Sequence, residues 1–179
     1  MKTFAITAVT IALPALFLCS CETWIPARHQ VPFNEREFAS YAGRGSGTVE
    51  GVIAVNAEDD GELHVGAGSY LTLLPVTSYT TEMVDREIRD GENLTSSDSR
   101  LRAYVRGATA DDGGNFVFND VPAGEYYLTG LVEWYVADDA QYQWACETIS
   151  VKNGQTIRVK VSRNIHRPGS PYLVVWRLE

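Results

Sequence analysis

The chain has 179 residues, with 15 Lys and Arg against 23 Asp and Glu, which gives a formal charge of −8. This excess of negative charge excludes a general affinity for nucleic-acid phosphates, and a 45% share of hydrophobic residues excludes a disordered chain. Cysteines and histidines number only three each, too few for a rich metal cluster, so we expect neither a metal nor a cofactor. The length suits one domain of ordinary size.

Residues 1–20 begin with one lysine and continue as an apolar run that ends in Leu18-Cys19-Ser20-Cys21. The run of about fifteen residues is shorter than the roughly 20 that a membrane span needs. Its end resembles the lipobox of bacterial lipoproteins, in which the cysteine is acylated and becomes the new N-terminus. The resemblance implies a signal peptide over 1–20, a lipid on Cys21 and an envelope location, with Glu22 favouring the outer membrane. The alternative is a secretory signal cut near Ser20, which would leave Cys21 as a thiol.

Residues 21–46 show no sustained period and contain two prolines and a glycine-rich cluster. We therefore expect a tether between the lipid and the folded body, with a short helix from Phe33 to Tyr41. Because Cys19 leaves with the signal and Cys21 carries the lipid, no disulfide is expected for Cys146. Its strand-like surroundings favour a small buried residue over a reactive thiol.

From Gly47 onward the dominant sequence period is two, which is typical of strands with one buried face. Turn signals such as Asp112-Gly113-Gly114 and Asn153-Gly154 separate the apolar runs. The expected strands cover residues 49–55, 70–76, 102–109, 116–118, 126–136, 143–151 and 157–161, with 172–178 as a further one. We therefore predict an all-β fold, a single antiparallel β-sandwich of about seven strands.

Residues 80–90 break this pattern, because Met83, Val84 and Ile88 have helical spacing. Thr80 or Thr81 is the expected cap and Gly91 the end, so a short helix is expected within an insertion over residues 78–101. The structural interpretation of its polar residues, without a binding role, is a solvated face with helix ion pairs such as Asp85–Arg89. The alternative is a polar patch formed by Thr77, Tyr79, Arg86, Arg89, Arg100 and Arg106.

Residues 111–128 carry the most informative motif of the chain. Phe116 and Phe118 lie two apart, so both rings enter one face of a strand. Asp111 can accept hydrogen bonds from turn amides, which predicts a structural corner; the alternative is a calcium site that also uses Asp112, Asn115 and Asp120. The residues that define the motif are Asp111, Gly114, Phe116, Phe118, Pro122, Gly124 and Tyr126.

This spacing resembles the motif of carboxypeptidase regulatory-like domains, a transthyretin-like (prealbumin-like) family of Ig-like β-sandwiches. Residues 49–53 resemble the opening strand of that family, and residues 154–159 resemble its closing strand. The resemblance implies one such domain over residues 47–163, which leaves 164–179 as a C-terminal extension or an extra strand. The family's carboxypeptidases hold their zinc in a separate domain, for which this chain has no room.

Catalysis needs a nucleophile and base, or an acid and base, held together in one site. His29, His64 and His166 follow no metal-binding spacing and stand in no hydrolase motif. We therefore expect no catalytic residues and no enzyme activity, and instead a noncatalytic envelope lipoprotein whose sandwich contacts another envelope protein or a glycan.

Two other functions stay open. In a carbohydrate-binding module, the side chains of Trp134, Tyr135, Tyr142 and Trp144 would form a stacking surface for sugar, provided that their rings are exposed. The expected fold and envelope location also resemble those of transthyretin-like anchor lipoproteins of type VI secretion systems, and this likeness rests on fold and location alone.

Overall fold

A computed structural model describes residues 26–56 and 61–162 of the protein. Its strands are β1 (Gly47–Asn56), β2 (Leu63–Val65), β3 (Tyr70–Pro75), β4 (Arg106–Thr109), β5 (Asn115–Val121), β6 (Gly124–Val136), β7 (Asp139–Val151) and β8 (Thr156–Val161). Its helical segments are α1 (Glu35–Phe38), η1 (Ala39–Tyr41), α2 (Ser78–Met83), η2 (Val84–Arg89) and η3 (Ser99–Ala103).

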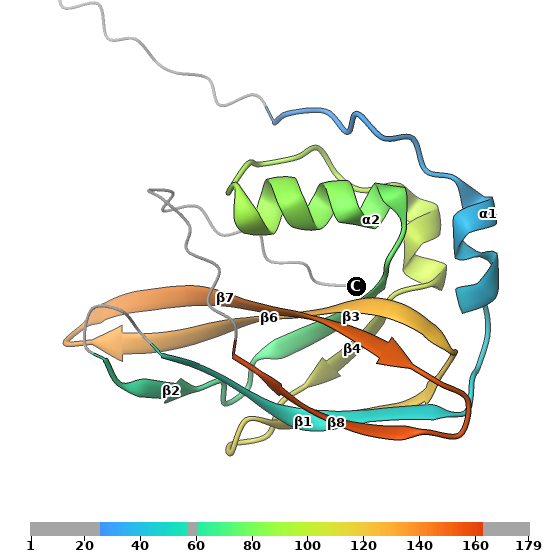
Figure 1. The fold of residues 1–179 in the computed structure, drawn as a ribbon. Helices are drawn as coiled ribbons and strands as arrows, with labels where there is room; N and C mark the ends of the chain where they lie inside the picture. The colour runs from blue at the N-terminus through green and yellow to red at the C-terminus, as the bar shows by residue number, and fades with distance from the viewer. Residues whose placement is uncertain (1–25, 57–60, 163–179) are drawn as a thin grey trace, which may run out of the picture.

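The strands form two stacked sheets, so the predicted all-β sandwich is confirmed (Figure 1). One sheet has the order β4-β3-β6-β7, and in the other β1 lies between β8 and β5 while β2 pairs with its far end. Every ladder is antiparallel except that between β1 and β8, which is parallel. This pair departs from the expected antiparallel sandwich because the chain changes sheets between β7 and β8 and so returns alongside β1 in the same direction.

The main core lies between the two sheets. Alternate residues of β1, including the fully buried Val49 and Ile53, face Leu71 and Leu128 of the other sheet. Phe116 and Phe118 are both buried and meet edge to face, with ring centroids 5.8 Å apart, as their spacing predicted. The opposite face of β8 carries exposed Arg158 and Lys160, so the expected one-sided strand is confirmed.

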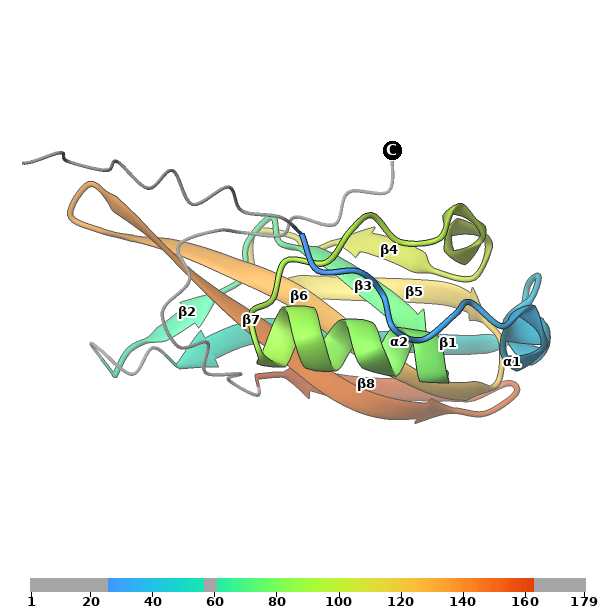
Figure 2. The same cartoon turned by 90° about the horizontal axis from the view of Figure 1, so that it is seen from above.

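A second apolar layer lies between the helices and the outer face of the sheet β4-β3-β6-β7 (Figures 1 and 2). Tyr127, Trp144 and Cys146 leave this sheet on the outer side and contact Val84 and Ile88 of η2. Cys146 is only 4% exposed, as expected for a small buried residue. The outer face of the other sheet is covered by none of the described helices.

The inserted helix begins two residues earlier than expected, because Thr77 is the cap rather than Thr80 or Thr81. The Thr77 side chain accepts from the Thr80 N–H, and the Thr80 side chain accepts from the Thr77 N–H, a reciprocal capping box. The helix then widens into a π-helical segment, η2, and Gly91 follows it in the left-handed conformation with φ +71°.

The strand expected over residues 102–109 is wrong in its first half. The side chain of Asp98 accepts from the Arg100 N–H and starts the 3₁₀ helix η3, so the strand begins only at Arg106. Leu101 is buried by this helix against Phe38 and Met83. The short strand β2 was not predicted, and the strand expected over 172–178 lies outside the described residues, as do residues 1–20 and Cys21.

Residues 27–41 of the expected tether pack against the sandwich and its helices. The predicted short helix near Phe33 is present, and Phe38 at its end is fully buried. Ala27 forms a bridge with Leu94, and Tyr41 packs edge to face on Tyr126. None of the helices described here is both long and apolar enough to span a membrane.

Candidate functional site

The predicted corner at Asp111 has the geometry of a turn. Its Oδ1 accepts from the N–H groups of Gly113 at 2.9 Å and Asn115 at 2.8 Å. The Asn115 side chain also donates to Asp111, and this hydrogen bond, followed by those from the backbone, lowers the pKa of the carboxyl. Among the described residues no group of three or more His, Cys, Asp and Glu side chains could hold a metal ion. The turn therefore accounts for Asp111.

The second half of the motif closes the corner around two tyrosines. The Tyr126 hydroxyl donates to the Pro122 carbonyl at 2.9 Å, and burial raises the pKa of this tyrosine to about 12. A methyl group at Gly124 would lie 2.4 Å from Cε1 of Tyr41, so the close approach of Tyr41 requires glycine. Pro122, Gly124 and Tyr126 thus serve the fold.

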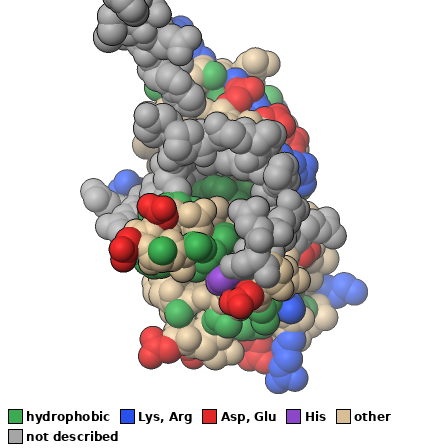
Figure 3. All heavy atoms as spheres, turned by 90° about the vertical axis from the view of Figure 1, so that its left-hand side faces the viewer, with side chains coloured by type: hydrophobic (Ala, Val, Ile, Leu, Met, Phe, Trp, Pro, Cys, Tyr) green, Lys and Arg blue, Asp and Glu red, His purple; other side chains and the backbone are tan. Residues whose placement is uncertain are grey.

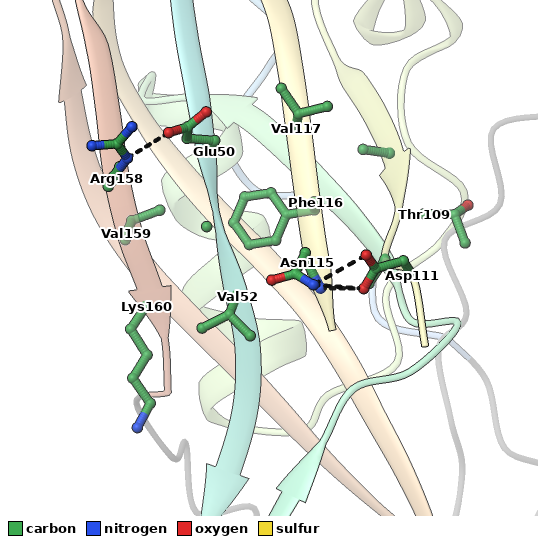
Figure 4. A pocket seen from close by; sticks show the side chains of 13 residues that line it. Glu50, Val52, Thr109, Asp111, Asn115, Phe116, Val117, Arg158, Val159 and Lys160 are labelled. Carbon is green, nitrogen blue, oxygen red and sulfur yellow. Dashed lines mark hydrogen bonds and ion pairs between the residues drawn. The ribbon is translucent and has the colours of Figure 1, made fainter. Parts of the chain in front are cut away.

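An open groove of about 920 Å³ crosses the sheet that contains β1, β5 and β8 (Figure 4). Its polar groups bind mainly one another: Arg158 donates to Glu50 at 2.5 Å on one side, and Asn115 donates to Asp111 on the other. Its floor offers no exposed aromatic ring, because Phe116 is only 5% exposed. The groove therefore leaves few charged groups for a ligand and gives it no ring on which to stack.

The N-terminal segment around residues 29–31 is held to α2 by a partly buried network of hydrogen bonds and ion pairs. Glu82 accepts from the backbone N–H groups of Gln30 at 2.7 Å and Val31 at 3.0 Å. Its carboxylate also pairs with Arg86 at 2.8 Å, and His29 Nδ1 lies 3.5 Å away. Burial by itself would raise the pKa of Glu82, but the backbone and Arg86 donors outweigh it and lower the pKa below its ordinary value.

The other polar residues of the insertion do not gather into a patch. Arg86 also binds Glu92, Arg89 pairs with Asp85 as predicted, and Arg106 donates to the Gly43 carbonyl. Thr77 and Tyr79 are buried. Arg100 binds Asp98, whose pKa falls to about 2 because of the hydrogen bonds that Arg100 donates. The interpretation as a solvated face with local pairs describes these arginines better.

The four aromatic residues of the β6–β7 hairpin lie on two faces of the sheet. Trp134 lies on the side of the sandwich core, where its ring stacks on His64 with centroids 4.5 Å apart. Trp144 lies on the opposite, outer side, but it is only 8% exposed because it packs with the helices. These two residues therefore do not contribute to one stacking surface with the tyrosines.

Tyr135 and Tyr142 do share an exposed face. Pairing of Glu133 with Tyr142, and of Tyr135 with Ala140, places both rings on the outer side of the hairpin. Their exposures are 65% and 44%. The Tyr135 hydroxyl donates to the Glu133 carboxylate at 2.7 Å, and this hydrogen bond raises the pKa of Tyr135. We call Glu133, Tyr135 and Tyr142 the tyrosine face.

More apolar side chains are exposed at the same end of the molecule. They belong to β2 and the tip of β6, two strands that contact each other, and comprise Leu63, Val65 and Val136. Figure 3 shows apolar side chains on this end of the protein with acidic groups around them. Sequence reasoning located the hairpin aromatics but missed this neighbouring apolar surface, because a three-residue strand such as β2 gives almost no periodic signal.

The fold and these surfaces define a β-sandwich protein with one helix-covered face. No protein-family model and no curated protein matches the chain. Among solved structures it is similar to a proposed carbohydrate-binding protein from Pseudomonas aeruginosa, with a TM-score of 0.63 and 25% identity over 73% of this chain and 97% of that protein. The structural similarity covers nearly the whole length of the Pseudomonas protein, so the two proteins share the β-sandwich architecture over that length.

Two more distant structures share less of the architecture. The minor pilin GBS52 of Streptococcus agalactiae has a TM-score of 0.37 and 13% identity, over 74% of this chain and 49% of the pilin. A proposed cell adhesion protein of Bacteroides ovatus has a TM-score of 0.32 and 12% identity, over 67% of this chain and 52% of that protein. Neither likeness is close enough to carry an argument.

Proposed function

We propose that this protein is a noncatalytic, lipid-anchored protein of the cell envelope whose β-sandwich binds carbohydrate through the tyrosine face. The observation that carries the proposal is the exposure of Tyr135 and Tyr142 on one side of the hairpin, with the Glu133 carboxylate opposite one ring and bound to the other. The similarity to a Pseudomonas aeruginosa protein that is itself a proposed carbohydrate binder supports the same function.

The chemistry of this face suits a sugar ring. A pyranose has a face of C–H groups that packs on an aromatic ring, and hydroxyls at its edge that donate to a carboxylate. Two rings and one acceptor make a small contact, so a single site of this kind binds weakly, with a Kd on the order of 1 mM. Many copies on one membrane would raise the overall affinity for a polymeric glycan.

The proposed lipid anchor and envelope location rest on the sequence at the N-terminus. Leu18-Cys19-Ser20-Cys21 after the apolar run supports lipidation of Cys21, and Glu22 supports the outer membrane. The motif from Asp111 to Tyr126, in the corner geometry described above, supports membership of the carboxypeptidase regulatory-like sandwiches. Mass spectrometry of the N-terminal peptide from the membrane fraction tests the lipid anchor. An acylated peptide that starts at Cys21 is expected, and an unmodified N-terminus elsewhere contradicts lipidation of Cys21.

Contact with an envelope protein is a second candidate function, favoured by the exposed Leu63, Val65 and Val136 beside the hairpin. Crosslinking in cells from a photoreactive group at Leu63 distinguishes the two. A single protein adduct favours this second candidate, whereas glycan-containing adducts without one favour carbohydrate binding.

A glycan array probed with the detergent-solubilised full-length protein tests carbohydrate binding. The double variant Tyr135→Ala/Tyr142→Ala should lose the signal, because it removes both stacking rings. The matched control is Val117→Ala, since Val117 is 49% exposed on the other sheet. Binding that the double variant retains in full, or an array without any signal above the control protein, would contradict the proposal.

A further inference from the structure

We propose that a cavity under the insertion is a second binding site, which takes a neutral polyol of monosaccharide size. The cavity has a volume of about 270 Å³ and lies between η2, η3 and the outer face of the sheet β4-β3-β6-β7. It is separate from the tyrosine face, so it goes beyond the proposed function. Pockets for drug-sized ligands span about 300–1,000 Å³, so one sugar ring suits the space better than a disaccharide.

The floor of the cavity carries two threonine residues. Thr72 of β3 and Thr129 of β6 are direct cross-strand partners on the outer side of the sheet, 8% and 3% exposed. Both line the cavity, and no described residue forms a hydrogen bond with either side chain. Neither hydroxyl oxygen is among the fully buried, unpartnered atoms of the described residues, so both are accessible from the cavity, where a bound hydroxyl group can donate to them or accept from them.

The surrounding strand positions make these threonines unusual. Leu74 and Tyr127, the next paired residues on the same side, are buried and pack against the helices. A face that served only to pack against η2 would continue this apolar pattern. Thr72 and Thr129 instead turn two groups that both donate and accept hydrogen bonds toward an enclosed space, as recognition of a polyol requires.

The walls divide into an apolar side and a polar side. Met83, Ile88 and Leu101 supply apolar surface, while Ser96, Ser97 and Ser99 supply hydroxyl-bearing residues. Glu87, 3% exposed, adds a carboxylate to the lining. A sugar ring presents the matching distribution, with C–H groups on its faces and hydroxyls around its edge.

The same chemistry disfavours a metal ion as the occupant. Asp98, the other carboxylate of the lining, is already bound by Arg100 at 2.9 Å and 2.8 Å. The described part of the chain contains no cluster of three or more potential metal-binding His, Cys, Asp and Glu residues. Arg102 also lines the cavity and adds a positive charge to the lining, so with the two neutral threonine hydroxyls on the floor the site suits a neutral polyhydroxylated ligand better than a cation.

Calorimetric titration of the full-length protein with a panel of free monosaccharides and inositol tests the site. At least one compound should bind, and Thr72→Val and Thr129→Val should each weaken it about tenfold, the effect of losing one hydrogen bond. Thr148→Val is the matched control, because Thr148 is an exposed threonine on the same sheet that does not line the cavity. Melting temperatures of all variants verify folding, and each single valine variant should melt no lower than the unmodified protein.

The proposal is overturned if no compound of the panel binds, or if both valine variants bind as tightly as Thr148→Val. It is also overturned if binding is lost only in Tyr135→Ala/Tyr142→Ala, because the ligand would then occupy the tyrosine face. Conversely, monosaccharide binding that this double variant retains supports the cavity even if the glycan array shows no signal. The two proposals thus fail in distinguishable ways.

Discussion

Replacing Glu82 by alanine should release the N-terminal segment from the helix that it crosses. Glu82 is the group that holds Gln30 and Val31, since its two carboxylate oxygens accept their N–H groups at 2.7 Å and 3.0 Å. The side chain is 7% exposed, and its partner Arg86 is 16% exposed. Water therefore replaces these contacts only if the segment moves away.

The expected magnitude follows from these contacts. A hydrogen bond to a charged group contributes about 1.5–3 kcal/mol, so losing two of them removes about 3–6 kcal/mol from the docking of the segment. Arg86 keeps its contact with Glu92 at 2.5 Å, which limits the cost of its lost partner. Because the segment can detach while the two-sheet core stays closed, the loss should appear as local opening more than as global unfolding.

Amide hydrogen exchange at Gln30 and Val31 measures this opening directly. Since about 1.4 kcal/mol corresponds to a factor of ten, exchange at both amides should accelerate on the order of 100-fold or more in Glu82→Ala. Asp85→Ala is the matched control on the same helical rod: its pair with Arg89 is 43% and 49% exposed, and such pairs contribute only about 0.3–0.5 kcal/mol.

Exchange at Gln30 and Val31 that is as slow in Glu82→Ala as in Asp85→Ala would refute this reasoning. The segment would then be held by its apolar contacts, such as the stacked rings of Phe33 and Phe38 with centroids 4.5 Å apart, and the carboxylate would be secondary.

Other consequences of the same structure are open to direct measurement. Because the pKa of Glu82 is lowered below its ordinary 4.5, its stabilising contribution is present above that value and is lost as the pH falls through the folded-state pKa. The protection of the Val31 amide, which is its intrinsic exchange rate at each pH divided by the observed rate, should therefore decrease as the pH is lowered below 4.5, and a protection that stays constant would contradict the assignment. Gly124→Ala should lower the free energy of unfolding by about 1–3 kcal/mol in urea titrations, because the added methyl meets Tyr41; no change would mean that the corner relaxes freely. Tyr126→Phe should lower the free energy of unfolding by about 1–2 kcal/mol, because it leaves the buried Pro122 carbonyl without its donor. Tyr135→Phe at the exposed hairpin should change the free energy of unfolding by less than about 0.5 kcal/mol. Equal effects of the two substitutions in urea titrations would contradict the difference expected from burial.

The parts of the fold that the sequence predicted are those with a strong local pattern. Ile157, Val159 and Val161 alternate with polar residues over a whole strand, and the turn at Asp111 brings its own hydrogen-bond acceptor. Residues 102–104 alternate in the same manner, but the cap supplied by Asp98 shifts them into a 3₁₀ helix. A one-residue capping interaction outweighs a short period of two, and periodicity alone does not register it.

The candidate sites depended on pairings that local sequence does not encode. Four aromatics near one hairpin were recognisable, but only the register of β6 with β7 places Tyr135 and Tyr142 on one side of the sheet and Trp134 and Trp144 on opposite sides. The cavity had one local sign, a threonine within the apolar run from Leu71 to Leu74. Its partner Thr129 lies far away in sequence, so the two hydroxyls come together only through the pairing of β3 with β6.

The affinity of the tyrosine face for sugar is the quantity that most directly tests the central claim. It can be measured by isothermal titration of the full-length protein with the best-bound array glycan. The account predicts that Tyr135→Ala/Tyr142→Ala weakens this affinity by about tenfold or more, while the melting temperature stays within about 2 °C of the unmodified protein. An unchanged affinity in a folded double variant would contradict it, since the glycan would then bind elsewhere on the sandwich.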